Sequence, residues 1–235
     1  MSAIKPRVPY ERKFSLVHGT ARRSRASLQK STRIIDHFQS MSARQFGWEL
    51  DLDLTVKVIE VEPPRIIYDR NGQPQTYFPD FRITYNNGDV EIAEVKSAKR
   101  RGDPETMAKY RRIGEVCRER GLKFRLVFSD RILREPKRRN VALLHYYLDW
   151  PLLESDLQAA TDYFDVNSEA SIGDMLTALP DLSRPKILAL VGRGYLWLNR
   201  FKKFDDNALI RLPRNYEENE TKVLAVDALG FGRQS

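Results

Sequence analysis

Two carboxylates and an ammonium group lie close together in the segment Tyr77–Lys96. Asp80 follows a proline, and Glu94 and Lys96 are separated by one residue at the end of an apolar run. Because side chains two positions apart in a strand leave the same face, Glu94 and Lys96 are expected to point the same way. Two carboxylates that converge from separate strands can hold Mg²⁺, which prefers oxygen ligands.

This set of groups suits the hydrolysis of a phosphodiester by water. The reaction needs a nucleophile near neutral pH, in-line geometry and neutralisation of charge on the phosphoryl oxygens, and carboxylate-held Mg²⁺, with Mn²⁺ as a substitute, supplies all three. We expect Asp80 and Glu94 to be metal ligands, the backbone carbonyl of Val95 to be a further ligand, and Lys96 to contact the phosphate or the attacking water. The Pro-Asp…Glu-x-Lys pattern is typical of metal-dependent nucleases, although ordinary solvated hairpins carry similar residues.

The turn between the two strands decides whether the carboxylates can meet. With a two-residue loop at 87–88, Phe81 would lie opposite Glu94 and Asp80 would face away. With a three-residue loop at 86–88, whose glycine takes the left-handed conformation, Asp80 lies opposite Glu94. We therefore predict the three-residue loop.

The surrounding sequence predicts an α/β nuclease domain over residues 36–150. A helix should run from Ser40 to about Asp53, and a second should begin at Pro104, after Asp103 as its cap, and stop at Gly121. Alternating or apolar runs predict strands at 55–61, 65–68, 81–85, 90–96 and 123–128. The result is a mixed sheet flanked by helices.

Residues 151–213 have a different pattern of apolar and polar residues, and they are expected to form a second, smaller domain that begins near Pro151. Its pattern predicts short helices at 153–164, 172–179 and 185–191, followed by paired strands at 195–198 and 208–212. Three helices and a hairpin form the element order of a winged-helix module, and the alternative is any small α+β domain. Residues 214–235 are expected to form a polar tail.

The charge pattern points to a polyanionic partner. The chain has a net charge of +8 and a pI of about 9.6, which favours nucleic acid by counterion release, although a soluble basic protein would look similar. Residues 1–35 hold nine Lys or Arg and one acid, Glu11, so we expect a basic, partly disordered arm. The candidate DNA-binding residues are Arg22, Arg23 and Arg25 in this arm, and Lys99, Arg100 and Arg101 after the strand predicted at 90–96.

Several function classes are disfavoured. The single cysteine, Cys117, excludes an internal disulfide and a zinc site built from several thiolates, and it suits a reducing cytoplasm. No apolar run approaches the ~20 residues that a membrane span needs, so we expect no membrane partner. The chain also lacks the Gly-x-x-x-x-Gly-Lys loop of many ATPases.

Residues 38–128 resemble the catalytic domain of the TnsA endonucleases, which have a restriction-endonuclease-like fold and work in heteromeric cut-and-paste transposons. The resemblance is carried by Phe38-Gln39-Ser40, Trp48-Glu49-Leu50-Asp51-Leu52-Asp53, Val56, Pro63, Ile66, Tyr77-Phe78-Pro79-Asp80-Phe81 and Glu94-Val95-Lys96. Residues 150–212 are similar, less specifically, to the winged-helix C-terminal domain of the same proteins.

The resemblance implies a function and a set of partners. A TnsA endonuclease nicks double-stranded transposon-end DNA at the 5′ ends of the element, a partner transposase cuts the 3′ ends, and the C-terminal domain and tail contact an AAA+ ATPase regulator. Asp80 corresponds to the metal-binding aspartate of the family, Glu94 to the next ligand position and Lys96 to the catalytic lysine. The implied location is the bacterial cytoplasm, in association with the nucleoid during activity.

One position departs from the family pattern Ser-x-x-Glu-Arg-x-Phe. The frame fits Ser40 to Phe46, but Ala43 stands in place of the glutamate, and a methyl group cannot ligate a metal. An engineered replacement that traps an uncleaved complex and a natural member with weakened activity are both open, and the intact surroundings favour the first. In either case we expect the chain to bind DNA but to nick it poorly.

Two alternative functions remain at this point. A non-catalytic DNA-binding scaffold that docks an ATPase and a transposase is favoured by Ala43. A stand-alone nuclease of the restriction or resolvase type is disfavoured by the second domain, which suits partner docking.

Overall fold

The computed structural model describes residues 24–70 and 72–213. These residues divide into two compact units. Within the described part of the chain, the first unit contains 24–51 and 55–132, and the second contains 52–54 and 133–213.

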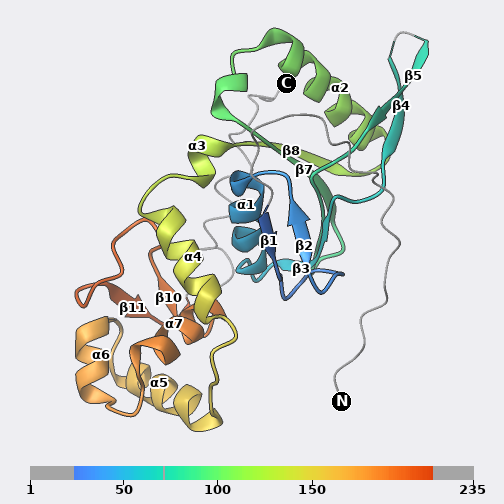
Figure 1. Ribbon diagram of the computed structural model, residues 1–235. Helices are drawn as coiled ribbons and strands as arrows, with labels where there is room; N and C mark the ends of the chain where they lie inside the picture. The colour runs from blue at the N-terminus through green and yellow to red at the C-terminus, as the bar shows by residue number, and fades with distance from the viewer. Residues whose placement is uncertain (1–23, 71, 214–235) are drawn as a thin grey trace, which may run out of the picture. The chain divides into compact units, whose positions relative to one another are not determined.

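The first unit is built on a mixed four-stranded sheet with the order β3-β6-β7-β8. Strand β6 pairs antiparallel with both β3 and β7, whereas β8 runs parallel to β7 because helix α2 provides the crossover between them (Figure 1). The predicted mixed α/β architecture is confirmed. The elements span Val56–Val61 (β3), Phe81–Tyr85 (β6), Val90–Lys96 (β7), Pro104–Glu119 (α2) and Lys123–Phe128 (β8).

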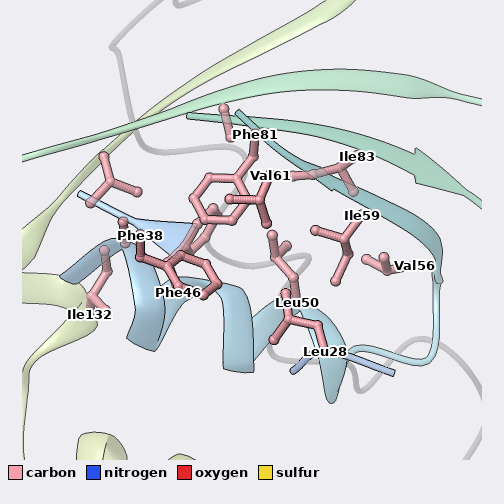
Figure 2. Close-up of a cluster of buried hydrophobic side chains, with 13 residues drawn as sticks. Leu28, Phe38, Phe46, Leu50, Val56, Ile59, Val61, Phe81, Ile83 and Ile132 are labelled. Carbon is pink, nitrogen blue, oxygen red and sulfur yellow. The ribbon is translucent and has the colours of Figure 1, made fainter. Parts of the chain in front are cut away.

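Each face of the sheet has its own apolar core. On the face covered by α1 (Met41–Asp51), Phe38, Phe46 and Phe81 gather with aliphatic side chains, as Figure 2 shows. Burial of each large side chain contributes about 1.5–3 kcal/mol. The other core lies beneath α2 and includes Ile92. Since Ile92 lies on the α2 face and side chains alternate along a strand, Glu94 and Lys96 also belong to that face.

Helix α1 is shorter than predicted, because it ends at Asp51. At its start, the Oγ of Ser40 accepts a hydrogen bond of 3.0 Å from the backbone N–H of Ala43, so Ser40 is the capping residue. The residues that follow the helix, 52–54, pack within the second unit. The buried Leu52 side chain lies beside Gly192 there.

A separate two-stranded hairpin precedes the strands β6 and β7, which carry the candidate site. Strand β4 (Ile66–Arg70) was predicted, whereas its partner β5 (Gln73–Tyr77) was not. The first four residues of β5 are all exposed and polar or proline, so they carry no apolar alternation. Figure 1 shows this hairpin extending from the sheet.

The predicted basic arm is wrong for residues 24–35, which are an integral part of the first unit. Strand β1 (Ser24–Ala26) pairs with β2 (Asp36–Phe38), and Leu28 is only 1% exposed. The Asp51 carboxylate accepts two backbone hydrogen bonds from this segment, each of 2.9 Å. Strong charge-assisted bonds of this kind hold the segment in place despite its basic side chains. The remainder of the predicted arm, 1–23, lies outside the described residues, as does the predicted tail.

The second unit contains the predicted three helices and hairpin, together with an additional short strand. Its sheet has the order β10-β11-β9, and all pairs are antiparallel. The elements are α4 (Lys137–Tyr147), α5 (Glu154–Val166), β9 (Ala170–Ser171), α6 (Ile172–Ala178), α7 (Arg184–Gly192), β10 (Trp197–Leu198) and β11 (Leu209–Arg211).

Helix α4 belongs to the second unit, so the division between the units lies at residue 132 and not at the predicted boundary near Pro151. The reason is a close approach between α4 and α7. A Cβ atom added to Gly192 would lie 3.3 Å from the backbone oxygen of Leu144 and 3.4 Å from the Leu148 side chain. A glycine at this position therefore lets the two helices pack together.

Candidate active site

The β6–β7 hairpin has the register that the sequence predicts. Phe81 pairs with Ala93, which places Asp80 opposite Glu94 one position farther along. The loop has three residues, and its glycine, Gly88, has a φ of +87°. This left-handed conformation favours glycine, so the turn residue fixes which side chains face each other.

Asp80 is tied to the opposite strand by its side chain. Its Oδ2 accepts a hydrogen bond of 2.8 Å from the backbone N–H of Val95. The Val95 side chain points into the α1-face core, so this strand segment is anchored on one face while its backbone holds Asp80. The carboxylate of Asp80 is thereby fixed beside the strand that carries Glu94.

Glu94 is the most enclosed member of the group, with 3% of its surface exposed. Its Oε2 accepts a hydrogen bond of 2.7 Å from the hydroxyl of Tyr77, and its Oε1 accepts one of 2.9 Å from the hydroxyl of Tyr110. Lys96 forms an ion pair with the same Oε1. Three donors, from β5, α2 and β7, therefore compensate a buried charge that would otherwise be strongly unfavourable.

The electrostatics keep all three donors protonated. Burial, followed by the Glu94 charge, raises the pKa of both Tyr77 and Tyr110 above the usual tyrosine value. Burial alone would lower the pKa of Lys96, but the nearby Glu94 and Asp80 carboxylates outweigh this effect and raise it. Lys96 is therefore a stable cation that can neutralise a phosphate, and it is poorly suited to act as a base.

The donor set fits a hard cation held by two carboxylates. An ionised carboxylate offers about four acceptor positions, and the three donors around Glu94 leave one, on Oε2. Mg²⁺ is commonly held by one or two carboxylates and keeps several waters. Among residues 24–70 and 72–213, no group of three or more His, Cys, Asp or Glu has an arrangement that could hold a metal.

Ala43 is not part of the group around Glu94. Its side chain is 6% exposed and packs in the α1-face core with Phe46. The methyl group contributes packing and no metal ligand.

The candidate DNA-binding residues that the structure describes differ in their surroundings. Arg22 and Arg23 lie outside the described residues, and Arg25 is exposed on β1. Arg101 forms a bidentate pair with Asp130, at 2.7 and 2.9 Å, and its guanidinium lies over the Phe128 ring. Lys99 and Arg100 lie in the short 3₁₀ helix Ala98–Arg100, directly after β7. Among the candidates that the structure describes, Arg101 makes a bidentate ion pair and a ring contact within the chain.

Sequence reasoning missed the two tyrosines that hold Glu94. The sequence predicts no role for Tyr110, and Tyr77 enters only as part of the segment that resembles the TnsA endonucleases. The available signal was chemical: an inward-facing tyrosine needs a partner for its hydroxyl, and a buried glutamate needs donors.

Comparison with known families identifies the first unit. Residues 53–129 match the model of the TnsA-like endonuclease N-terminal domain, a range that contains Asp80, Glu94 and Lys96 but not Ala43. No curated protein matches the chain. No helix in the described part of the chain has the length and apolar content that a membrane crossing requires. The domain over residues 53–129 therefore belongs to the TnsA-like endonuclease family.

Proposed function

We propose that this chain is the Mg²⁺-dependent DNA endonuclease subunit of a transposition complex, which nicks the 5′ ends of the element while a partner transposase cuts the 3′ ends. The observation that carries the proposal is the hairpin register, which places Asp80 opposite Glu94 and leaves Lys96 on the same face as Glu94. A nuclease of the TnsA-like family acts on DNA, and a transposase partner follows from the family.

Each residue of the site has a distinct role in this proposal. Asp80 and Glu94 hold the cation, and the Val95 carbonyl is a further ligand. When bound, Mg²⁺ supplies polarisation of the phosphoryl oxygen and a water of lowered pKa. Lys96 remains charged and neutralises the scissile phosphate, while the two tyrosine hydroxyls keep the Glu94 carboxylate in one orientation. Loss of a partner that orients a metal ligand typically costs about 10–100-fold in metal affinity or activity.

The alanine at position 43 lowers the activity of this copy in the proposal. In the family pattern this position carries a third carboxylate, whereas Ala43 of this chain packs in the α1-face core and supplies none, so the chain is expected to bind DNA and to nick it slowly. The test is a nicking assay on transposon-end DNA in Mg²⁺, with and without the partner transposase, that compares the chain with Ala43→Glu. The expected result is faster nicking by Ala43→Glu.

Two controls make the assay decisive. Ala43→Gln has almost the same size as Ala43→Glu but no charge, so it separates metal binding from repacking of the buried site. Asp80→Asn removes one of the proposed ligands and should abolish nicking. If the unmodified chain already nicks as fast as Ala43→Glu, the assignment of position 43 fails, and if no variant nicks in any divalent metal, the metal-nuclease proposal itself fails.

The second unit is the proposed docking module for an AAA+ ATPase regulator. The supporting observation is the element order helix, strand, helix, helix, strand, strand over residues 154–211, which is the order of a winged helix. The competing function is a non-catalytic scaffold, and Ala43 favours it. A scaffold would support excision by the partner transposase without any dependence on Asp80, so Asp80→Asn distinguishes the two.

A further inference from the structure

Positive charge is concentrated on two segments of the second unit. Residues 133–140 and 199–203 together contain seven Lys or Arg and a single acid, Glu135. The entire chain has a net charge of only +8, so these thirteen residues hold a large share of it. We call them the α4–loop surface.

Buried polar contacts bring the two segments together. Asn140 on α4 is 3% exposed, and its Nδ2 donates hydrogen bonds of 2.8 Å to the backbone oxygen of Arg200 and 2.7 Å to that of Lys202. One turn earlier, the ammonium of Lys137 lies 5.7 Å from the centre of the Phe201 ring. The loop that follows β10 is therefore held against the first turn of α4, and its two lysines, at 202 and 203, are exposed.

Within the two segments, seven Lys or Arg stand against one acid, Glu135. Helix α4 has basic residues and no acid in its first turn, where the positive end of the helix dipole makes further positive charge unfavourable. Glu135 pairs with Arg138 at 2.7 Å, and a nearby acid of the loop, Asp206, pairs with Arg184. Arg139, Lys202 and Lys203 are exposed to solvent. A fold that gathers cations in this way gains stability when a polyanion covers them.

We propose that the α4–loop surface binds the phosphate backbone of double-stranded DNA. Lysine is depleted in the core of protein–protein interfaces, whereas lysine and arginine on one surface are the electrostatic signature of phosphate binding. The inference rests on the proposed function, in which the endonuclease domain in the other unit of the chain acts on DNA. The α4–loop surface would add sequence-independent contacts to the backbone of the same DNA.

The test measures the affinity of the full chain for a DNA duplex of arbitrary sequence by fluorescence anisotropy, in EDTA and at several salt concentrations. Lys202→Ala combined with Lys203→Ala removes two exposed cations without touching the buried Asn140 contact. Each phosphate contact contributes about 0.9 to the slope of log K against log salt. The double variant should therefore flatten the slope by about 1.8, and its affinity at low salt should fall at least tenfold.

A matched control removes the same charge elsewhere. Arg111→Ala combined with Arg118→Ala changes two exposed residues of α2, and it should leave the slope within error of the parent chain. Equal slopes for the parent and the Lys202/Lys203 variant would overturn the proposal. So would a variant that binds DNA normally but no longer binds a partner protein, because the surface would then serve an acidic protein. Circular dichroism melting confirms that the variants are folded, and the use of EDTA keeps this result independent of nicking.

Discussion

The hydroxyl of Tyr110 donates a hydrogen bond of 2.9 Å to Oε1 of Glu94, which connects helix α2 to the strand that carries the candidate site. Hydrogen bonds to charged groups contribute about 1.5–3 kcal/mol when they are buried. Tyr110→Phe should therefore lower the free energy of unfolding, measured by urea denaturation, by a value in that range. If Glu94 is a metal ligand, as proposed above, loss of a partner that orients it should also weaken Mn²⁺ binding, measured by calorimetry, by about 10–100-fold.

Tyr68→Phe is the matched control for this prediction. Tyr68 is buried in the same α2-face core, and no hydrogen bond involves its hydroxyl in the described part of the chain. Its substitution should leave both stability and Mn²⁺ binding nearly unchanged. Equal effects of the two substitutions would mean that Tyr110 contributes only packing.

Gly88 controls the register of the hairpin. Its φ of +87° is unfavourable for any residue with a Cβ atom, although the space around it is open. Gly88→Ala should therefore destabilise the protein by about 1–2 kcal/mol through backbone strain alone. Gly102→Ala is the control, since Gly102 has equally open space and no positive φ. Thermal melts of the two variants should differ, and identical melting temperatures would contradict the role of the turn.

The hairpin could be predicted because its determinants are local. Alternation along the strands, the polar turn and the glycine together fix the register, and these signals lie within twenty residues of one another. The packing of Leu28 could not be predicted in the same way, because it depends on backbone contacts with Asp51, more than twenty residues away. In that segment the basic side chains dominate the composition, while a single apolar residue makes the buried contact.

The same limit explains the missed tyrosines and the misplaced domain boundary. Glu94 is bonded by Tyr77 and Tyr110, which lie 17 and 16 residues away along the chain, and only the tertiary fold brings them to one carboxylate. Pro151 favours a boundary in the local sequence, because a proline commonly marks the end of a helix. Helix α4 belongs to the second unit because it packs against α7 at Gly192, which is a tertiary contact.

Acid should weaken the second unit through Asp156, which is 6% exposed. Burial alone would raise its pKa, but hydrogen bonds from the backbone N–H of Leu153 and from Lys186, at 2.9 and 2.7 Å, outweigh burial and lower it. Because the folded-state pKa lies below the unfolded value of about 3.9, this stabilisation is complete well above pH 4 and is lost as the pH falls through the folded pKa. Asp156→Asn should destabilise the protein at pH 7, and the difference should shrink below about pH 4.

Denaturant titrations at several pH values check this expectation. Asp162→Asn is the control, because Asp162 lies on the same helix but is exposed, and it should have little effect at any pH. A difference between Asp156→Asn and the parent chain that stays constant from pH 7 to pH 3 would exclude the carboxylate as the titrating group.

Cys117 should be chemically inert in the folded protein. The thiol lies on the inner face of α2 with no exposed surface, and burial raises its pKa to about 11. The thiolate is the reactive form, so at pH 8 both access and ionisation limit attack by a thiol reagent. Labelling should therefore be very slow in native buffer and complete within the mixing time in concentrated urea. Rapid labelling of the native chain would show that α2 opens readily, and since Tyr110 lies on the same helix, the bond to Glu94 would then be transient as well.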